Sequence, residues 1–313
     1  MTVMRVERVV YGVPNLDECV RFFEDFGLFP AGDSGQPSEP GARFTTPTGQ
    51  VIELRPADDP GLPAPVQDGP SLREIIWGVD TAEAVDALAA GLITDRTVWT
   101  DAEGTVHAVD ETGWGVGLTV SQPGPATPGS LAAQYPGANR SGAVARVNQP
   151  LDPPGRVRPL RLCHVALDIP QQERERAVDF YVSRLGFVPT DRVAKVGVFM
   201  RAPGDTDHHT LLLCHRPDRA GINHCAYEVA RVDEVIVGAN DMIEKGWHEA
   251  RRLGRHTVGS NIFRFISAPC GGRVEFAADM DRVDENYGPY DHEETPPHTI
   301  WTLRLQRDQE GDH

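Results

Sequence analysis

Hydrophobic and polar positions follow the same order in the two halves of the chain. In the first half, residues 7–13 alternate as a half-buried strand does, and residues 15–26 (NLDECVRFFEDF) have the spacing of an amphipathic helix. This helix is predicted to end at Gly27. Short strands are predicted at residues 42–46 and 50–55, joined by the turn PTG.

The second half repeats this order of elements. Residues 161–169 are predicted to form a strand, and residues 173–184 a helix that leads into the tripeptide LGF. Further strands are predicted at residues 196–201 and 209–214. The segments VRFFEDFGLFP and VDFYVSRLGFVP resemble each other, which indicates an internal repeat.

Two further units of the same kind begin at Arg73 and Ile222. In each of them a strand (REIIWGVD or NHCAYEVA) leads to a helix and then to shorter strands. The pattern therefore predicts an α+β protein of four βαβββ modules, paired into two domains that are each a curved, open, mixed sheet barrel.

The domain limits follow from a Pro/Gly/Ser-rich segment at residues 122–159, which has little apolar periodicity and is typical of a linker. It separates an N-terminal module pair (1–121) from a C-terminal module pair (160–280). The tail (281–313) is acidic and contains prolines. Its apolar stretch at residues 300–305 is expected to dock as a late strand.

Composition narrows the range of partners. The chain has 313 residues, 40% of them hydrophobic and 24% charged, with a net charge of −16. This acidic balance argues against a nucleic-acid backbone or an anionic membrane as the main partner. No stretch approaches the roughly 18 apolar residues of a membrane span, no signal-peptide pattern opens the chain, and the five cysteines show no CxxC spacing. We therefore expect a cytoplasmic protein with mostly buried, reduced thiols.

Three residues of the second half carry the candidate chemistry. They are His164 in LCHVALDIP, His224 in INHCAYEV and Glu275 in GGRVEF, each in a strand-like apolar segment. A single histidine in such a strand is more often a hydrogen-bonded core residue, but an unpaired carboxylate is costly to bury. Two imidazoles and one carboxylate form the facial triad that holds non-haem Fe(II) and leaves positions open for substrate and O₂.

With these residues placed on the repeats, the chain resembles the vicinal oxygen chelate superfamily, and within it the two-domain type I extradiol ring-cleaving dioxygenases. The stretch GRHTVGSNIFRFISAPCGGRVEF is similar to the C-terminal signature of that family. The resemblance implies that His164, His224 and Glu275 bind Fe(II), with Mn(II) as the alternative. It also implies a small catechol-like aromatic substrate, O₂ as co-substrate, and a homo-oligomer.

The resemblance assigns roles to three further histidines. His209 in DTDHHTLLLCH occupies the place of the acid–base group beside the O₂ site, and a neutral imidazole suits that work near pH 7. His208 is the alternative, because a slip of one residue turns a side chain to the opposite face of a strand. His256 in GRHT is expected to border the substrate hydroxyls, although its basic context also suits an exposed loop histidine.

Phe265 departs from the family pattern, which has a tyrosine at this place. Phenylalanine cannot make the hydrogen bond that the tyrosine hydroxyl makes. Such a bond to a charged oxygen is worth roughly 1.5–3 kcal/mol, so its loss is expected to slow ring cleavage. Tyr287 and Tyr290 in the tail are candidate replacements, with surface turn tyrosines as the alternative interpretation. His248 and Arg201 are candidates for contact with a polar substituent of the substrate.

The first domain lacks the ligand set. Tyr11 and Trp77 stand where histidines would open its two units, and Glu53 in VIELR has no histidine partners there. We expect a metal-free scaffold. The sequence therefore predicts an Fe(II)-dependent extradiol-type dioxygenase. The alternatives are a non-oxidative metal-dependent isomerase or lyase of the same fold, and a non-catalytic aromatic-binding protein.

Overall fold

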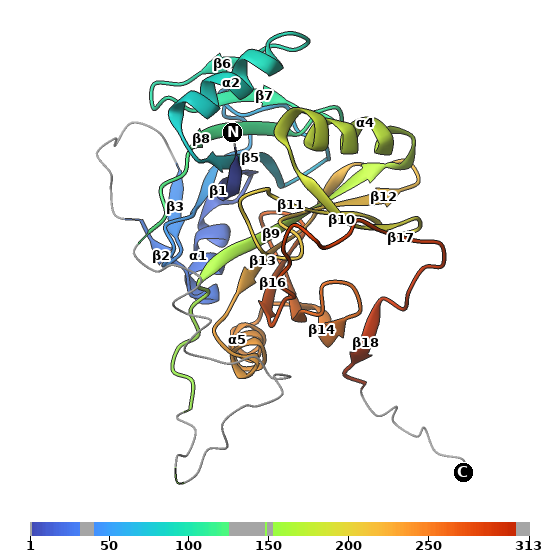
Figure 1. The fold of residues 1–313 in the computed structure, drawn as a ribbon. Helices are drawn as coiled ribbons and strands as arrows, with labels where there is room; N and C mark the ends of the chain where they lie inside the picture. Colours follow the sequence, from blue (N-terminus) through green and yellow to red (C-terminus); the bar gives the residue numbers. More distant parts are fainter. Residues whose placement is uncertain (1, 32–40, 125–147, 149–152, 305–313) are drawn as a thin grey trace.

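The computed structural model describes residues 2–31, 41–124, 148 and 153–304. In this part of the chain two mixed β-sheets lie against each other, with helices on their outer faces (Figure 1). Among these residues no helix combines the length and the apolar character that crossing a bilayer requires.

The first sheet has eight strands. Its elements in chain order are β1 (Val3–Val13), α1 (Leu16–Phe26), β2 (Phe29–Pro30), β3 (Ala42–Thr45), β4 (Val51–Pro56), β5 (Ser71–Val79), α2 (Ala82–Leu92), β6 (Trp99–Thr100), β7 (Val106–Val109) and β8 (Gly115–Val120). The order across the sheet is β2-β3-β4-β1-β5-β8-β7-β6, so the first strand of each module lies at the centre.

The second sheet has ten strands. Its elements are β9 (Arg161–Pro170), η1 (Gln171–Glu173), α4 (Arg174–Asp179), η2 (Phe180–Arg184), β10 (Val188–Val193), β11 (Gly197–Arg201), β12 (Leu211–Arg216), β13 (Gly221–Glu228), α5 (Val232–Glu244), β14 (Glu249–His256), β15 (Ile262–Ser267), β16 (Arg273–Ala278), β17 (Tyr290–His292) and β18 (Thr299–Thr302). The order across the sheet is β17-β10-β11-β12-β9-β13-β16-β15-β14-β18.

The predicted four-module repeat is confirmed by the strand pairing. In every module the last strand lies parallel to the first: β4 to β1, β8 to β5, β12 to β9 and β16 to β13. The two modules of a domain meet through antiparallel first strands, β1 with β5 and β9 with β13. The chain is thus α+β with two open mixed sheets, as expected.

Local signals explain the first helix. The Asn15 side chain accepts a hydrogen bond from the Glu18 amide at the start of α1, and Gly27 ends the helix with φ of 98°, a left-handed conformation.

The segment predicted as one helix at residues 173–184 is more irregular. It begins as a 3₁₀ turn, continues as α4 and ends as a π-helical turn. Hydrogen-bond register in a short helix is not visible in its apolar spacing.

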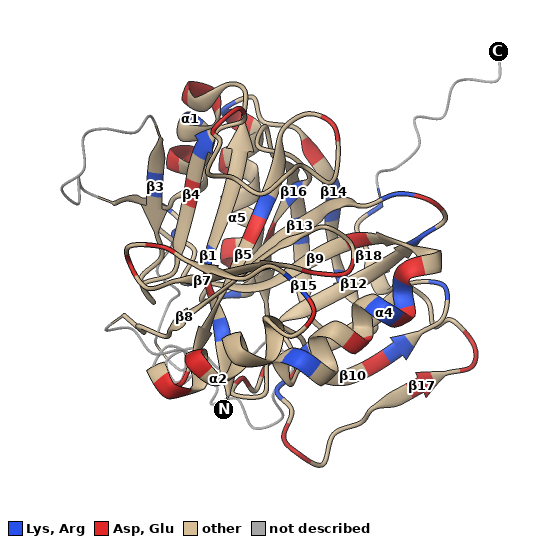
Figure 2. Cartoon of the chain, turned by 90° about the horizontal axis from the view of Figure 1, so that it is seen from above, with Lys and Arg blue, Asp and Glu red and all other residues tan. Residues whose placement is uncertain are grey.

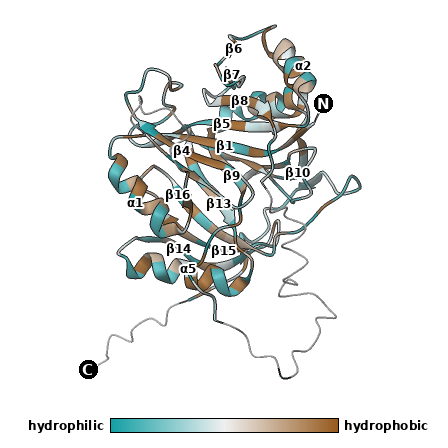
Figure 3. Cartoon of the chain, turned by 90° about the vertical axis from the view of Figure 1, so that its left-hand side faces the viewer, coloured by the Kyte–Doolittle hydropathy of each residue, from teal (hydrophilic) through white to brown (hydrophobic). Residues whose placement is uncertain are grey.

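The two sheets share one hydrophobic core. In Figure 3 the central strands β1 and β5 are mainly hydrophobic, whereas α1 and α5 carry both hydrophobic and hydrophilic stretches. Gln50 joins the two domains by donating to the carbonyls of Val6 (2.9 Å) and Leu162 (2.7 Å) and accepting from the Leu162 amide (2.8 Å). These bonds hold β9, which carries one site residue, against the first domain.

The tail returns to the second sheet and extends it at both edges. β17 pairs with β10, and β18 pairs with β14 (Figure 1). The late strand expected within residues 300–305 is therefore present at Thr299–Thr302, while residue 305 lies outside the described residues. Most of the predicted linker also lies outside them, so the boundaries 1–121, 122–159, 160–280 and 281–313 stay predictions.

Candidate metal centre

His164, His224 and Glu275 come from three strands that are neighbours in the second sheet. His164 on β9 and Glu275 on β16 both lie opposite Ala226 of the central strand β13. His224 is two residues before Ala226, so its side chain points to the same face as that of Ala226. The small alanine leaves this face open, and the three longer side chains converge over it.

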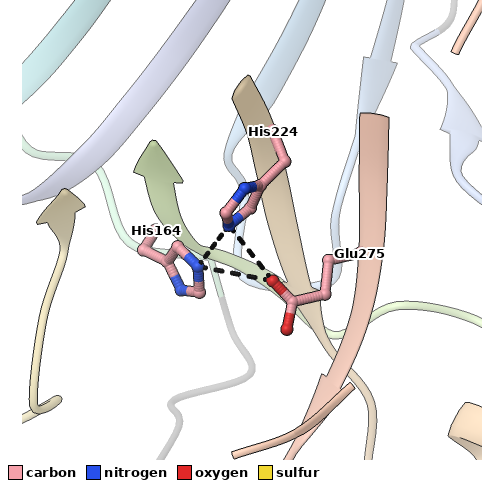
Figure 4. Close-up of side chains that lie close together, drawn as sticks. All are labelled: His164, His224 and Glu275. Carbon is pink, nitrogen blue, oxygen red and sulfur yellow. Dashed lines mark hydrogen bonds and ion pairs between the residues drawn. The ribbon is translucent and has the colours of Figure 1, made fainter. Parts of the chain in front are cut away.

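These three residues, here called the His–His–Glu cluster, place one ligand atom each around a common point (Figure 4). The Nε2 atoms of His164 and His224 are 3.0 Å apart. Oε2 of Glu275 lies 3.5 Å from Nε2 of His164 and 3.3 Å from Nε2 of His224. All three side chains are buried, and Glu275 is fully inaccessible to solvent.

The surroundings of His224 place its proton on Nδ1. The Asn223 side chain donates to Asp168 (2.7 Å) and its Oδ1 accepts from Arg273, which together orient the amide. Oδ1 of Asn223 then accepts from Nδ1 of His224 (2.8 Å). Nε2 of His224 is left with its lone pair, as a metal ligand requires.

The cluster fits a divalent metal ion. Burial lowers the pKa of both His164 and His224 to about 3, so neither ring carries a charge near neutral pH. Oε1 of Glu275 accepts from Asn261 (2.8 Å), but its Oε2 is buried and has no hydrogen-bond donor among the described residues. A buried carboxylate oxygen that faces imidazole nitrogens without a donor is unfavourable unless a cation lies between them.

A cavity of about 290 Å³ opens beside the cluster. His164, His224, His209, His256 and Phe265 all line it, so the structure brings together five of the eight predicted site residues at this cavity. Glu275 lies beneath, at the cluster itself. The volume is at the lower end of the range for small-molecule pockets, which suits a ligand with a single aromatic ring.

Burial and contacts favour His209 over His208 as the histidine that faces the cavity. The His209 ring lies 4.3 Å from the His164 ring, centroid to centroid, and lines the cavity. His208 is fully buried, does not line the cavity, and places Nε2 2.7 Å from Oδ2 of Asp191. The alternative assignment of the acid–base role to His208 is thus not supported, whereas its contact with His209 is direct.

Asp191, a residue that the sequence did not single out, organises this histidine pair. Its carboxylate accepts from Nε2 of His208, from the Tyr287 hydroxyl (3.2 Å) and from Nε2 of His292. Burial by itself raises the pKa of Asp191, but the bonds from His208 and His292 bring it below its ordinary value. Asp191 is therefore an anion near neutral pH.

The Asp191 carboxylate determines which ring nitrogens of His208 and His209 carry a proton. Because Nε2 of His208 donates to Asp191, Nδ1 of His208 is an acceptor, and it lies 3.1 Å from Nδ1 of His209. Nδ1 of His209 must then be the donor, which leaves its Nε2 with a lone pair. Burial, reinforced by the neighbouring histidines, lowers the pKa of His209 well below 6.5, so the ring is neutral.

His256 and Phe265 form part of the cavity wall. The His256 ring stacks on Phe263 at 4.1 Å, and its Nδ1 lies 3.3 Å from the His298 carbonyl oxygen. Phe265 is buried with its ring edge-on to the His224 ring at 5.0 Å. The tail residues Pro296, Pro297 and His298 close the cavity on this side, which no pattern in the sequence indicated.

Four expectations about polar contacts are not supported. His248 is exposed and Arg201 donates to the backbone of Pro203 and Asp205, and neither lines the cavity. Tyr287 is bonded to Asp191 and Tyr290 is 52% exposed, so neither supplies the phenol that Phe265 lacks. Position along the sequence alone could not separate these four residues from the cavity wall.

The first domain contains no metal-ligand cluster among the described residues. The Tyr11 hydroxyl donates to Cys225 (3.1 Å), and Trp77 packs against Phe187. Glu53 pairs with Arg8 and Arg43. These side chains have structural partners within the fold, and the metal-free scaffold role stays a prediction.

Comparisons with known proteins agree with this geometry. Residues 161–276, from the start of β9 into β16, match the family model of the Glyoxalase/Bleomycin resistance protein/Dioxygenase superfamily. This part of the chain is similar to that superfamily. The resemblance inferred from the sequence is thereby confirmed.

Two curated relatives are similar to part of the chain. Metapyrocatechase 2 of Cupriavidus necator is 40% identical over 148 residues, which are 47% of this chain and 43% of that protein. Biphenyl-2,3-diol 1,2-dioxygenase of Paraburkholderia xenovorans is 28% identical over 142 residues, 44% of this chain and 46% of that protein. The matched segments thus span less than half of either relative.

Solved structures extend the likeness in fold to both domains. A 2,2',3-trihydroxybiphenyl 1,2-dioxygenase from Sphingomonas wittichii has a TM-score of 0.72 at 19% identity, covering 97% of this chain and 100% of that one. A Mn(II)-bound glyoxalase from Novosphingobium aromaticivorans has a TM-score of 0.69 at 22% identity, covering 93% and 87%. At these identities the likeness establishes the two-domain fold.

Proposed function

We propose that the protein is an extradiol ring-cleaving dioxygenase that opens a catechol-like aromatic ring with O₂ and uses Fe(II) held by His164, His224 and Glu275. The observation that carries the proposal is the buried Oε2 of Glu275, which has no donor and faces two neutral imidazoles at the floor of a cavity. Mn(II) is the alternative metal, because a ligand set of nitrogen and oxygen separates the two ions poorly. The curated relatives, a metapyrocatechase and a biphenyl-2,3-diol 1,2-dioxygenase, support the substrate class.

The metal supplies, when bound, open coordination positions for two adjacent substrate oxygens and for O₂, and a path for electrons between them. The protein supplies the surroundings. Phe199, Leu212 and Val258 give the cavity an apolar side that excludes water from the aromatic ring. Phe265 closes the cavity beside His224.

His209 is proposed to act as the general acid–base group. Its Nε2 keeps a lone pair because Nδ1 donates to His208, and the ring is neutral near pH 7 because burial lowers its pKa. It is therefore able to take a proton from a substrate hydroxyl and to return it during ring opening. His256 borders the same cavity and is the second candidate for contact with the substrate hydroxyls.

The test is O₂ consumption by the anaerobically Fe(II)-loaded protein with a panel of catechols and hydroquinones, together with the absorbance of a yellow ring-opened product. We expect one O₂ per substrate, and a fall of about 100-fold or more in kcat for His209→Ala with metal retained. His248→Ala is the matched control, since this histidine is exposed in the same domain. No O₂ uptake by iron-loaded protein with any diol would refute the proposal.

One observation favours a second candidate, a non-oxidative isomerase or lyase that uses the metal as a Lewis acid. No tyrosine lines the cavity among the described residues, so the hydrogen bond expected from a phenol at Phe265 has no counterpart. The same experiment separates the two, because substrate conversion without O₂ consumption identifies non-oxidative chemistry. An aromatic-binding protein without turnover would bind the same ligands equally well with and without metal. Assembly into a homo-oligomer stays a prediction.

A further inference from the structure

The cavity beside the His–His–Glu cluster has a charge opposite to that of the whole chain. The sequence contains 46 acidic and 30 basic residues, and Figure 2 shows Asp and Glu spread over many elements. The residues that line the cavity include Lys195, Arg216, Arg251 and Arg273, but no Asp or Glu. A local excess of cations in an acidic protein points to an anionic ligand.

Two of these four cations have simple explanations. Arg216 forms an ion pair with Asp168 (2.9 Å), which Arg219 shares (3.3 Å), so a carboxylate already lies beside its charge. Lys195 is exposed and is solvated by water. The remaining excess of charge therefore comes from Arg251 and Arg273.

Neither Arg251 nor Arg273 has a carboxylate within ion-pair distance in the part of the chain that the structure describes. Nη1 of Arg251 donates to Nε2 of His298 (2.6 Å), and burial lowers the pKa of His298 to about 4, so this acceptor is neutral. Arg273 donates to the carbonyl and side-chain oxygens of Asn223, which are neutral as well. Two guanidinium groups thus share a partly buried wall without a carboxylate in direct contact, and Asp168 and Glu275 act on them only from farther away.

The two guanidiniums converge on one side chain. The guanidinium carbon of Arg251 lies 5.8 Å from the Phe265 ring centroid, and that of Arg273 lies 5.1 Å from it. Burial first, and then the like charge of Arg273, lower the pKa of Arg251, while Glu275 raises it by less. Since arginine stays protonated in proteins, the pair remains doubly positive, and a bound anion would relieve the repulsion.

We propose that Arg251 and Arg273 bind a carboxylate substituent on the aromatic ring of the substrate. The assignment rests on the proposed function for the diol part of the ligand. Phe265 touches both guanidiniums and also the His224 ring, so the anion subsite lies one aromatic side chain away from the metal cluster. Guanidinium groups suit this role because their planar donors match a carboxylate. A short carboxylated catechol fits the cavity of about 290 Å³.

The test compares 3,4-dihydroxybenzoate with its methyl ester, which has the same diol and no charge. Binding is measured by calorimetry under anaerobic conditions, with the Fe(II)-loaded protein and again with the metal-free protein. We expect the acid to bind roughly 10- to 100-fold more tightly than the ester, the range of a charge-assisted hydrogen bond. Added salt should weaken the binding of the acid more than that of the ester.

Arg251→Gln is the informative variant, because Arg273 also orients Asn223 beside His224. It should reduce the preference for the acid by about tenfold, and Arg251→Lys should restore part of it. The matched control is Arg216→Gln, which removes a guanidinium of the same cavity that is paired with Asp168. It should change the preference by less than about threefold.

Equal affinity of the wild-type protein for acid and ester would overturn the proposal, as would a full preference retained in Arg251→Gln. If Arg251→Gln does not fold, the comparison of acid and ester in the wild-type protein and in Arg251→Lys still decides. The outcome is separate from that of the proposed function. O₂ uptake with catechol but no preference for the acid rejects only the subsite, whereas tight binding of the acid without O₂ uptake with any diol rejects only the dioxygenase.

Discussion

Asp191→Asn tests whether a carboxylate outside the cavity sets the proton position on His209. The substitution keeps the size of the side chain and removes its charge. Asp191 is 3% exposed and accepts from His208, Tyr287 and His292. An asparagine offers one oxygen and one amide donor to these three donors, so the proton on Nε2 of His208 loses its anionic acceptor.

The magnitude follows from the bond between His208 and Asp191, which is 2.7 Å long and buried. A hydrogen bond to a charged group contributes about 1.5–3 kcal/mol, and each 1.4 kcal/mol corresponds to a factor of ten. If the substitution reduces by that amount the free-energy preference for the His209 tautomer with a lone pair on Nε2, kcat falls by about 10- to 100-fold. KM and metal content should change little, because Asp191 lines neither the cavity nor the cluster.

The assay is steady-state O₂ consumption by the Fe(II)-loaded variant, with metal analysis and urea unfolding on the same preparation. Tyr287→Phe is the matched control, since it removes one donor to Asp191 and leaves the bond to His208 in place. It should lower kcat by less than about threefold. A folded, metal-replete Asp191→Asn protein with kcat within about twofold of wild type would refute the reasoning, and His209 would then be positioned by other contacts.

Three further results are expected. Glu275→Gln should lower metal affinity at least about tenfold, because the buried charge that attracts the ion is removed; stoichiometric metal after dialysis of this variant would count against the cluster. The lowered pKa of about 3 for His164 and His224 keeps both rings unprotonated until the pH falls toward that value, so metal affinity should change less than about threefold between pH 6 and pH 8, and a tenfold weaker affinity at pH 6 would contradict this. Gln50→Ala should lower the free energy of unfolding in urea by about 2–4 kcal/mol, because three hydrogen bonds with the backbones of both domains are lost; a change below about 0.5 kcal/mol would show that the domains do not depend on them.

The repeat was visible in the sequence because each module obeys local periodicities. Alternation marks strands and a spacing of three to four residues marks helices, and both recur four times in the same order. The predicted starts and ends lie within a few residues of the observed ones, as with the helix predicted at 15–26 and found at Leu16–Phe26. The irregular hydrogen bonding of the segment at residues 173–184 could not be predicted, since it leaves no trace in the apolar pattern.

The choice between neighbouring histidines needed the structure. His208 and His209 both precede β12, which begins at Leu211, so alternation along the strand did not apply to them. Asp191 on β10 decides the matter by binding His208, and it is 17 residues away in the sequence. The surface positions of His248 and Tyr290 could not be predicted from the sequence either, because exposure depends on which segments cover a strand.

The sequence by itself determined the four modules, their pairing into two domains and the residues of the His–His–Glu cluster. Strand alternation and the place of a residue within a module are enough to bring ligands from adjacent strands to one face of a sheet. Only the tertiary structure decided the cavity, the proton positions on His208 and His209, and the placement of Arg251 and Arg273 without a carboxylate in direct contact. These depend on the tail and on side chains from strands far apart in sequence, whose burial and distances are set when the sheets pack together.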